Sequence, residues 1–418
     1  MREPSESEED EMPDLFEKCR GFFSDPSVAE SMGYPASPHR AKELGVYPFF
    51  IPLDQTEGTE VTIQGRRLVM LGSNNYLGLT THPEVREAAV RAIREFGTSC
   101  TGSRFLNGTL ALHGELERRL ALFVGKEKAL VFSTGYQANL GVLSALIGRS
   151  DIVVCDKEDH ASLIDGCRLA LGRMARFRHN SAGDLDRVLA ACPPDAGKLV
   201  VVDGVFSMGG EIVSLPDVLA VCRKHAARLL VDDAHGMGVL GGGRGTAAHF
   251  GLVDEVDLIV GTFSKSFASI GGFVAGDETT IHWIQHLARS LIFSASLPAP
   301  NVAAALAALD ITEREPERVE RVNAIADRMR ESLRDLGFNV GESETPIIPI
   351  FIGNSLDTMH AWRALFDAGV YVNVAIPPAV PQGKALLRTS YMATHTDGQM
   401  DRVLEVFASV GKSLGLIA

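Results

Sequence analysis

The stretch "VDLIVGTFSKSFASIGG" (residues 256–272) decides the fold. Its first five residues, 256–260, are mostly apolar and β-branched, which is typical of a buried strand. One lysine, Lys265, follows this strand among small and hydroxyl residues, with two glycines behind it. A lysine after a strand is usually a solvated strand end, so the meaning of Lys265 depends on what the rest of the chain places beside it.

The same pattern recurs from about residue 127, where short apolar runs alternate with amphipathic helical patterns. The runs are "KALVFST", "DIVVCD", "RMARFRHN", "KLVVVDGVFS", "RLLVDDAHG", "VDLIVGTFSK" and "GGFVAG". This alternation predicts βα units and an α/β fold built on a mainly parallel sheet.

The character of the sequence changes after "ASLPAP" (295–300). One long charged helical stretch is predicted over 301–337, and shorter segments follow: "IIPIFIG", a helix "TMHAWRALFDAG", "VYVNVA", "ALLRTSY" and a last helix near 397–415. This mixture indicates a smaller α+β domain. We therefore predict three parts, namely an acidic leader and N-terminal segment (1–60), a large domain (61–297) and a small C-terminal domain (298–418).

Composition narrows the class of protein. The chain has 418 residues, of which 45% are hydrophobic, so it can bury a sizeable core. Its net charge of −13 argues against broad nucleic-acid binding but allows a local basic pocket for an anionic ligand. There is no signal-peptide core and no apolar run long enough for a membrane span, so we expect a cytoplasmic protein. The six scattered cysteines and twelve histidines show no metal-ligand spacing, so no metal site is predicted.

Polar groups cluster where the predicted strands end. The first helix after "VFST" starts near Gly135 and Tyr136, and the other strand ends supply His160, Ser207, Asp232, Asp233, His235, Thr262, Ser264 and Lys265. Ligands on such sheets bind beyond the carboxyl ends of the strands. A lysine amine, a buried carboxylate, a histidine ring and free helix amides match the aldehyde, ring nitrogen, ring face and phosphate of pyridoxal phosphate.

Several ordered motifs carry a resemblance that covers roughly residues 45–416. They are "NNYLGL" (74–79), "STGYQANLG" (133–141), "DHASLIDG" (159–166), "DGVFSMGG" (203–210), "VDDAHGMG" (231–238), "GTFSKS" (261–266) and "LLRTSYMATHT" (386–396). The chain resembles the α-oxoamine synthases, a branch of the fold type I pyridoxal-phosphate enzymes. The resemblance implies an aspartate-aminotransferase-like fold with a seven-stranded-type sheet, and a homodimer with shared active sites.

Within this family, "GSRFLNGT" (102–109) and three other segments are most similar to the bacterial serine palmitoyltransferases. That similarity implies a decarboxylative Claisen condensation of L-serine with palmitoyl-CoA, which gives 3-ketodihydrosphingosine, CoA and CO2. One departure is Ile376, where some of these enzymes carry an arginine that contacts the substrate carboxylate. The same chemistry with glycine, alanine or cysteate therefore stays open, as do a plain aminotransferase and an inactive aminotransferase-like regulator. The presence of both Lys265 and Asp232 argues against the regulator.

The resemblance also implies roles for single residues. Lys265 would form the Schiff base with the cofactor and act as the base at Cα. Asp232 would pair with the pyridine nitrogen, and His235 would bond the ring hydroxyl. His160 would stack on the ring and help to orient the substrate carboxylate. The remaining expected contacts are Ser207 near the ring hydroxyl; Gly135, Tyr136, Ser264 and a partner subunit's Ser294 at the phosphate; Thr262 at the cofactor; Arg388 on the amino-acid carboxylate; and Asn75 near the substrate.

Two features have simpler explanations. The segment "GMGVLG" (236–241) fits G-x-G-x-x-G after a strand, but a loop-like "GGRGTAAHFG" follows it, so a dinucleotide site is disfavoured. Asp233, beside Asp232, is predicted to be structural. No nucleic-acid partner is expected, and a peripheral membrane contact stays open.

Overall fold

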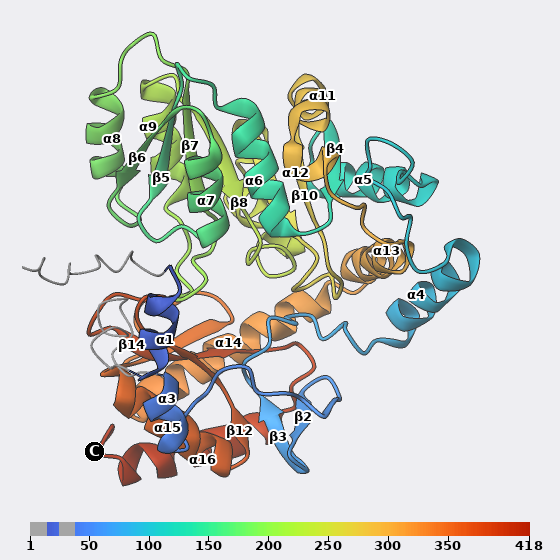
Figure 1. Cartoon of the computed structure of the whole chain (residues 1–418). Helices are drawn as coiled ribbons and strands as arrows, with labels where there is room; N and C mark the ends of the chain where they lie inside the picture. Colours follow the sequence, from blue (N-terminus) through green and yellow to red (C-terminus); the bar gives the residue numbers. More distant parts are fainter. Residues whose placement is uncertain (1–14, 25–37) are drawn as a thin grey trace, which may run out of the picture.

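The computed structural model describes residues 15–24 and 38–418 (Figure 1). The predicted acidic leader lies largely outside the described residues. Within the described part of the chain, no helix is both long and apolar enough to cross a membrane.

A seven-stranded sheet occupies the upper half of Figure 1. Its strands, in spatial order, are β4 (Lys128–Phe132), β10 (Gly272–Gly276), β9 (Leu258–Thr262), β8 (Arg228–Asp232), β7 (Lys198–Asp203), β5 (Ile152–Asp156) and β6 (Arg173–Phe177). Strands β5 to β9 pair in parallel, which confirms the predicted α/β class. β10 is antiparallel to both β4 and β9, because the short segment 263–271 turns the chain back without a crossover helix.

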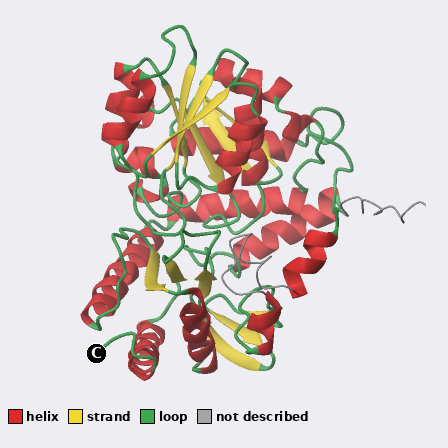
Figure 2. Ribbon diagram, turned by 60° about the vertical axis from the view of Figure 1, so that its left-hand side comes forward, coloured by secondary structure: helices red, strands yellow, loops and turns green. Residues whose placement is uncertain are grey.

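Helices cover both faces of this sheet (Figure 2), which explains why its strands read as continuous apolar runs. In β8, Leu229 and Val231 pack toward one face, while Leu230 packs toward the other. The first face carries α5 (Ala111–Val124), α8 (Ala182–Ala190), α9 (Leu215–Lys224) and α13 (Ala299–Arg314), with α4 (Pro83–Phe96) against α13. The second face carries α6 (Gly135–Leu146), α7 (Ala161–Leu169), α11 (Glu278–Leu287) and α12 (Arg289–Ile292).

The predicted single helix over 301–337 is wrong. The structure has two helices there, α13 and α14 (Glu317–Asp335), and the break falls at Pro316. Proline lacks the amide proton and clashes with the preceding turn, so an internal proline kinks or ends a helix, and here the helix ends.

Two smaller sheets lie in the lower half of Figure 1. One consists of β11 (Ile347–Gly353), β14 (Ala385–Ser390) and β13 (Asn373–Ala375), and the other of β1 (Gln55–Thr56), β2 (Glu60–Ile63), β3 (Arg66–Met70) and β12 (Val370–Tyr371). They share a core with α14, α15 (Ser355–Asp367) and α16 (Asp397–Ser413). Nearby lie α1 (Glu17–Ser24) and α3 (Pro38–Glu43).

The segment "VYVNVA" does not form one strand. Val370 and Tyr371 pair in parallel with β3, whereas Asn373 to Ala375 pair with β14 in the other sheet. Strands from the start and the end of the chain thus meet in one core. The predicted boundaries after residues 60 and 297 remain a proposal.

Candidate active site

A pocket of about 300 Å³ opens at the carboxyl ends of the central strands. Eight of the predicted site residues line it: Gly135, Tyr136, His160, Asp232, His235, Thr262, Ser264 and Lys265. A second pocket of about 470 Å³ shares His160, His235 and Lys265 with the first. Ser207 and Arg388 line this second pocket, so the two cavities adjoin at Lys265.

Lys265 follows β9 in the tight connection to β10, where its carbonyl accepts a hydrogen bond from the Ala268 amide at 3.1 Å. Burial lowers the pKa of the amine to about 8, although Asp232 and Asp203 favour its charged form. The protein therefore holds an amine that loses its proton at a clearly lower pH than an ordinary lysine does.

Asp232 is the last residue of β8, and two groups fix its carboxylate. Asn139 Nδ2 donates to Oδ2 at 2.6 Å, and the Ala234 amide donates to Oδ1 at 3.0 Å. Asp233 points elsewhere, because its carboxylate accepts from the amide and the hydroxyl of Thr246. The predicted structural role of Asp233 agrees with these contacts.

His235 is buried beside a residue that the sequence analysis missed. Its Nδ1 is hydrogen-bonded to the Tyr76 hydroxyl at 2.7 Å. Burial, Lys265 and Arg388 all lower the pKa of His235, so the ring is neutral near pH 7. Burial raises the pKa of Tyr76 to about 12. Tyr76 lies within the quoted motif "NNYLGL", but nothing local in that motif indicates a partner 159 residues away.

His160 stands where β5 passes into α7. Its amide donates to Asp203 Oδ2 at 2.9 Å, and its Nδ1 is hydrogen-bonded to Ser162 Oγ at 2.7 Å. Desolvation lowers the pKa of His160, with Asp232 acting in the opposite direction. The ring is thus a neutral group on the wall of both pockets.

The amino end of α6 forms one end of the first pocket. Thr134 caps the helix by accepting from the Gln137 amide at 3.0 Å, and the first helical amides have no partner inside the helix. A Cβ added to Gly135 would lie 3.0 Å from Thr262 Cβ, so this turn packs closely on β9. Ser264 is hydrogen-bonded to Thr262 across the same corner at 2.9 Å. Amides and hydroxyls therefore converge here, as a phosphate requires.

Ser294 lies close to the same helix within one chain. Gln137 Nε2 donates to its hydroxyl at 3.1 Å. Its expected contact with a partner subunit's cofactor stays a prediction.

Arg388 is 5% exposed and lies on β14. Its Nε donates to the Ser207 carbonyl at 2.6 Å, which leaves other guanidinium N–H groups for the second pocket. Asn75 lines neither pocket, because its side chain bonds Leu79 and Thr80 within its own loop. The neighbouring Asn74 lines the second pocket instead. Ile376 is buried against another cluster and lines neither pocket.

Comparison with known proteins shows which family the chain belongs to. The family model described as aminotransferase class I and II matches residues 66–407. The chain belongs to this family. Its sequence is 49% identical to the serine palmitoyltransferase of Sphingobacterium spiritivorum over 372 residues, which is 89% of this chain and 93% of that protein. It is 42% identical to the 8-amino-7-oxononanoate synthase of Geobacter sulfurreducens, over 90% of this chain and 97% of that protein.

Solved structures agree as well. The serine palmitoyltransferase of Sphingomonas wittichii matches with a TM-score of 0.90 and 40% identity, over 97% of this chain and 100% of that chain. A serine palmitoyltransferase variant from S. paucimobilis, solved with a PLP–myriocin aldimine, matches with a TM-score of 0.91 and 39% identity over the same shares. Within the class I and II aminotransferases, the chain is thus an α-oxoamine synthase, as the motifs predicted.

The donor set of the first pocket fits the pyridoxal phosphate expected of this family. An amine of lowered pKa, a carboxylate held at a strand end, a histidine on the wall and a helix amino end surround one cavity. Each group of the cofactor has a residue of matching chemistry.

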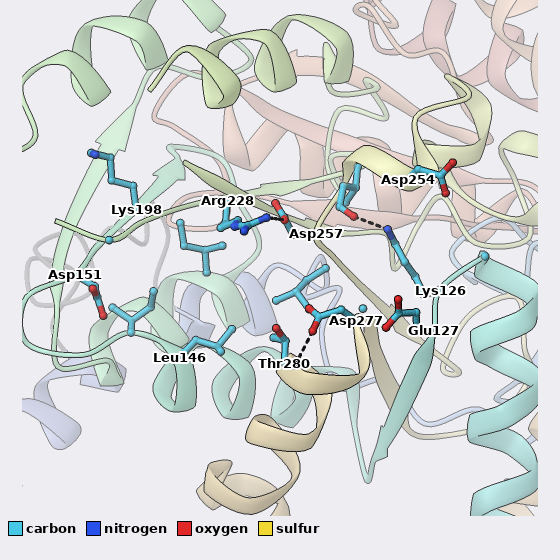
Figure 3. A pocket seen from close by; sticks show the side chains of 17 residues that line it. Lys126, Glu127, Leu146, Asp151, Lys198, Arg228, Asp254, Asp257, Asp277 and Thr280 are labelled. Atoms are coloured by element: carbon cyan, nitrogen blue, oxygen red, sulfur yellow. Dashed lines mark hydrogen bonds and ion pairs between the residues drawn. The ribbon is translucent and has the colours of Figure 1, made fainter. Parts of the chain in front are cut away.

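A larger pocket of about 710 Å³ lies at the opposite ends of the strands (Figure 3). None of the predicted site residues lines it. Its charged groups mostly serve the fold: Arg228 pairs with Asp257 at 2.6 Å, and Lys126 donates to the carbonyls of Val253 and Val256. Size alone therefore does not locate the chemistry of this aminotransferase-family protein.

Proposed function

We propose that the protein is a pyridoxal-phosphate-dependent acyltransferase that condenses L-serine with palmitoyl-CoA to 3-ketodihydrosphingosine, CoA and CO2. The observation that carries this proposal is the position of Lys265 at the junction of two pockets, one with the cofactor donor set and one with the buried Arg388. The similarity to several serine palmitoyltransferases at 46–49% identity supports it.

Each residue contributes a defined step. The bound cofactor supplies an electron sink next to Cα of the amino acid. Lys265, whose pKa is about 8, takes the Cα proton and returns it to the product. Arg388 binds the amino-acid carboxylate through guanidinium N–H groups that Ser207 does not occupy, and so orients Cα. Asp232 would face the pyridine nitrogen, and the neutral His235 would donate to or accept from the ring hydroxyl.

A homodimer with shared sites belongs to the same proposal. Phe105, Leu106 and Phe293 are 55%, 77% and 73% exposed. Their segments are adjacent, because the Ser296 amide donates to the Gly102 carbonyl at 2.9 Å. This apolar loop surface, defined by Phe105, Leu106 and Phe293, suits burial against a second copy of the chain, and the second copy would then lie near Ser294.

A cytoplasmic location and a peripheral membrane contact stay predictions.

A second candidate keeps the chemistry and changes the amino acid. Ile376 packs in a cluster away from both pockets. This position therefore supplies no second basic side chain to bind the substrate carboxylate beside Arg388. A site with a single arginine also suits glycine, alanine or cysteate. The similarity to an 8-amino-7-oxononanoate synthase favours keeping this alternative.

The test is thiol release from palmitoyl-CoA by the holoenzyme with serine, glycine, alanine or cysteate, with each product identified by mass. We expect rapid release with serine and a product of the mass of 3-ketodihydrosphingosine. Release with another amino acid alone would favour the second candidate. Amino-group transfer to a keto acid without thiol release would overturn both in favour of an aminotransferase.

A further inference from the structure

A buried asparagine connects two of the predicted catalytic residues. Asn139 lies in the second turn of α6 and is 1% exposed. Its Nδ2 donates to Asp232 Oδ2 at 2.6 Å and to Ser162 Oγ at 2.9 Å. Ser162 Oγ is in turn 2.7 Å from His160 Nδ1. One side-chain amide therefore joins the carboxylate at the end of β8 to the histidine at the start of α7.

The orientation of this amide follows from its neighbours. The Oδ2 atom of Asp232 accepts from Asn139, so the nitrogen of the side-chain amide, and not its oxygen, faces Asp232. Asn139 Oδ1 then lies buried without a hydrogen-bond partner among the described residues. Leaving this oxygen buried without a partner costs folding free energy. The favourable contribution of the Asn139 side chain therefore comes from the two hydrogen bonds that Nδ2 donates.

The chain of bonds also sets the tautomer of His160. Ser162 Oγ already accepts from Asn139, so its own proton is available for His160 Nδ1. The Ser162 amide points at the same Nδ1 from 3.3 Å, as a helix cap. A nitrogen that accepts from two donors carries no proton. A neutral imidazole with an unprotonated Nδ1 has its proton on Nε2.

We infer that Asn139 is a positioning residue that holds Asp232 in place and, through Ser162, fixes His160 as the tautomer protonated at Nε2. His160 lines both pockets, and its Nδ1 edge is taken up by α7, so Nε2–H is the donor that remains for a ligand. That donor is matched to an anionic or carbonyl oxygen, such as the amino-acid carboxylate. This inference rests on the proposed function for the identity of the ligand, but not for the tautomer.

The direct test is ¹⁵N NMR of the holoenzyme labelled at histidine, with His160 assigned from the signal lost in His160→Gln. We expect an unprotonated Nδ1 and a protonated Nε2 in the unchanged protein. In Ser162→Ala, which keeps Asn139 on Asp232 but leaves the residue-162 amide, at 3.3 Å, as the one remaining donor to Nδ1, we expect the Nδ1-protonated tautomer to gain population. In Asn139→Leu, we expect the same gain and a loss of affinity for added pyridoxal phosphate of roughly tenfold, the effect of one lost hydrogen bond.

Ser144→Ala is the matched control. It removes a hydroxyl from the same helix, but this hydroxyl bonds only backbone carbonyls of that helix, those of Leu140 and Gly141. Melting temperatures of all variants show whether they fold, and Ser162→Ala serves if Asn139→Leu does not. In kinetics at saturating pyridoxal phosphate, both network variants should raise KM for serine about tenfold while KM for palmitoyl-CoA stays within twofold, since His160 is the group proposed to contact the amino acid.

An Nδ1-protonated His160 in the unchanged protein would overturn the inference. So would a His160 signal and a serine KM in both folded network variants that equal those of Ser144→Ala. A protein that fails to release CoA with serine, yet shows the expected tautomer and its loss in Ser162→Ala, would overturn the proposed substrate and leave the positioning role intact.

Discussion

At the scale of the residue, burial and neighbouring charges have opposite effects on the pKa of Lys265. Burial lowers the pKa of its amine to about 8, and the carboxylates of Asp232 and Asp203 only partly oppose this effect. The unfolded chain, with the ordinary lysine pKa of about 10.4, binds more protons between pH 8 and 10 than the folded chain does. Folding stability must therefore rise with pH across this window.

The apoprotein provides the measurement. In Lys265→Met the ammonium of this half-buried lysine is absent, so we expect a free energy of unfolding at pH 7 about 2 kcal/mol above that of the unchanged apoprotein, after allowance for screening by solvent. The difference should shrink as pH rises from 8 to 10, because the unchanged lysine then loses its proton. Urea unfolding at several pH values tests this. A difference that stays constant with pH would show that packing, not charge, explains it.

Arg388 gives a second prediction at this scale. We expect Arg388→Ala to weaken serine binding by roughly 30-fold, as for a lost charge-assisted hydrogen bond, and to leave palmitoyl-CoA binding unchanged. Spectral titration of the holoenzyme with serine measures this. Arg363→Ala is the control, because that guanidinium is exposed and pairs with Asp367 on its own helix. Equal serine affinity in the two variants would remove Arg388 from the substrate site.

The site residues that could be predicted from the sequence are those that follow the carboxyl ends of strands, where ligands bind in parallel sheets. His160, Asp232, His235 and Lys265 follow strands of one sheet, so their convergence could be expected. Tyr76 and Asn139 could not be predicted as parts of the site. Their partners, His235 and Asp232, lie 159 and 93 residues away, and the sequence pattern contains no signal for such side-chain pairs.

At the scale of the element, the first turn of α6 depends on its contact with β9. A Cβ at Gly135 would lie 3.0 Å from both Thr262 Cβ and Thr262 Oγ1, so a branched side chain would push the turn outward. We expect Gly135→Val to fold and to bind pyridoxal phosphate at least tenfold more weakly, because the helix amides move away from the phosphate. Fluorescence titration of the apoprotein measures this affinity.

Gly183→Ala is the matched control, since this glycine lies in the first turn of α8 with no atom within 4 Å of an added Cβ. We expect an unchanged affinity and a gain in stability of about 0.5–1 kcal/mol from helix propensity. Unaltered cofactor affinity in Gly135→Val would show that the amino end of α6 does not hold the phosphate.

Helices and strands could be predicted where the period of the apolar residues and the length of the segment indicate the same element. The alternating runs gave the strands of the large sheet, and β11 and α16 begin where the pattern predicted. The direction of β10 depends on the tight connection at residues 263–271, and the division of "VYVNVA" depends on two sheets that meet at Val372. Such tertiary pairings override local propensity, so no local pattern reveals them.

At the scale of the whole molecule, the apolar loop surface bears on assembly. We expect the double variant Phe105→Asp, Leu106→Asp to be largely monomeric by sedimentation velocity, and to lose most of its turnover with the dimer. Leu171→Asp is the control, because Leu171 is 64% exposed, between the values of Phe105 and Leu106, but follows α7 at a distant part of the sheet. A dimer that persists in the double variant would place the contact between copies elsewhere.

The pairing of Val69 with Val370 has a consequence for how the chain is made. A ribosome must add residues 70–369 before β3 can meet β12, which takes about 15–60 s at ordinary rates of synthesis. During that time the apolar side chains of β2 and β3 emerge without their partners, while the seven-stranded sheet is already complete at residue 276. In the nascent chain, β2 and β3 thus lack their packing partners until translation is nearly over. Chaperone binding to newly made protein should concentrate on residues 55–71.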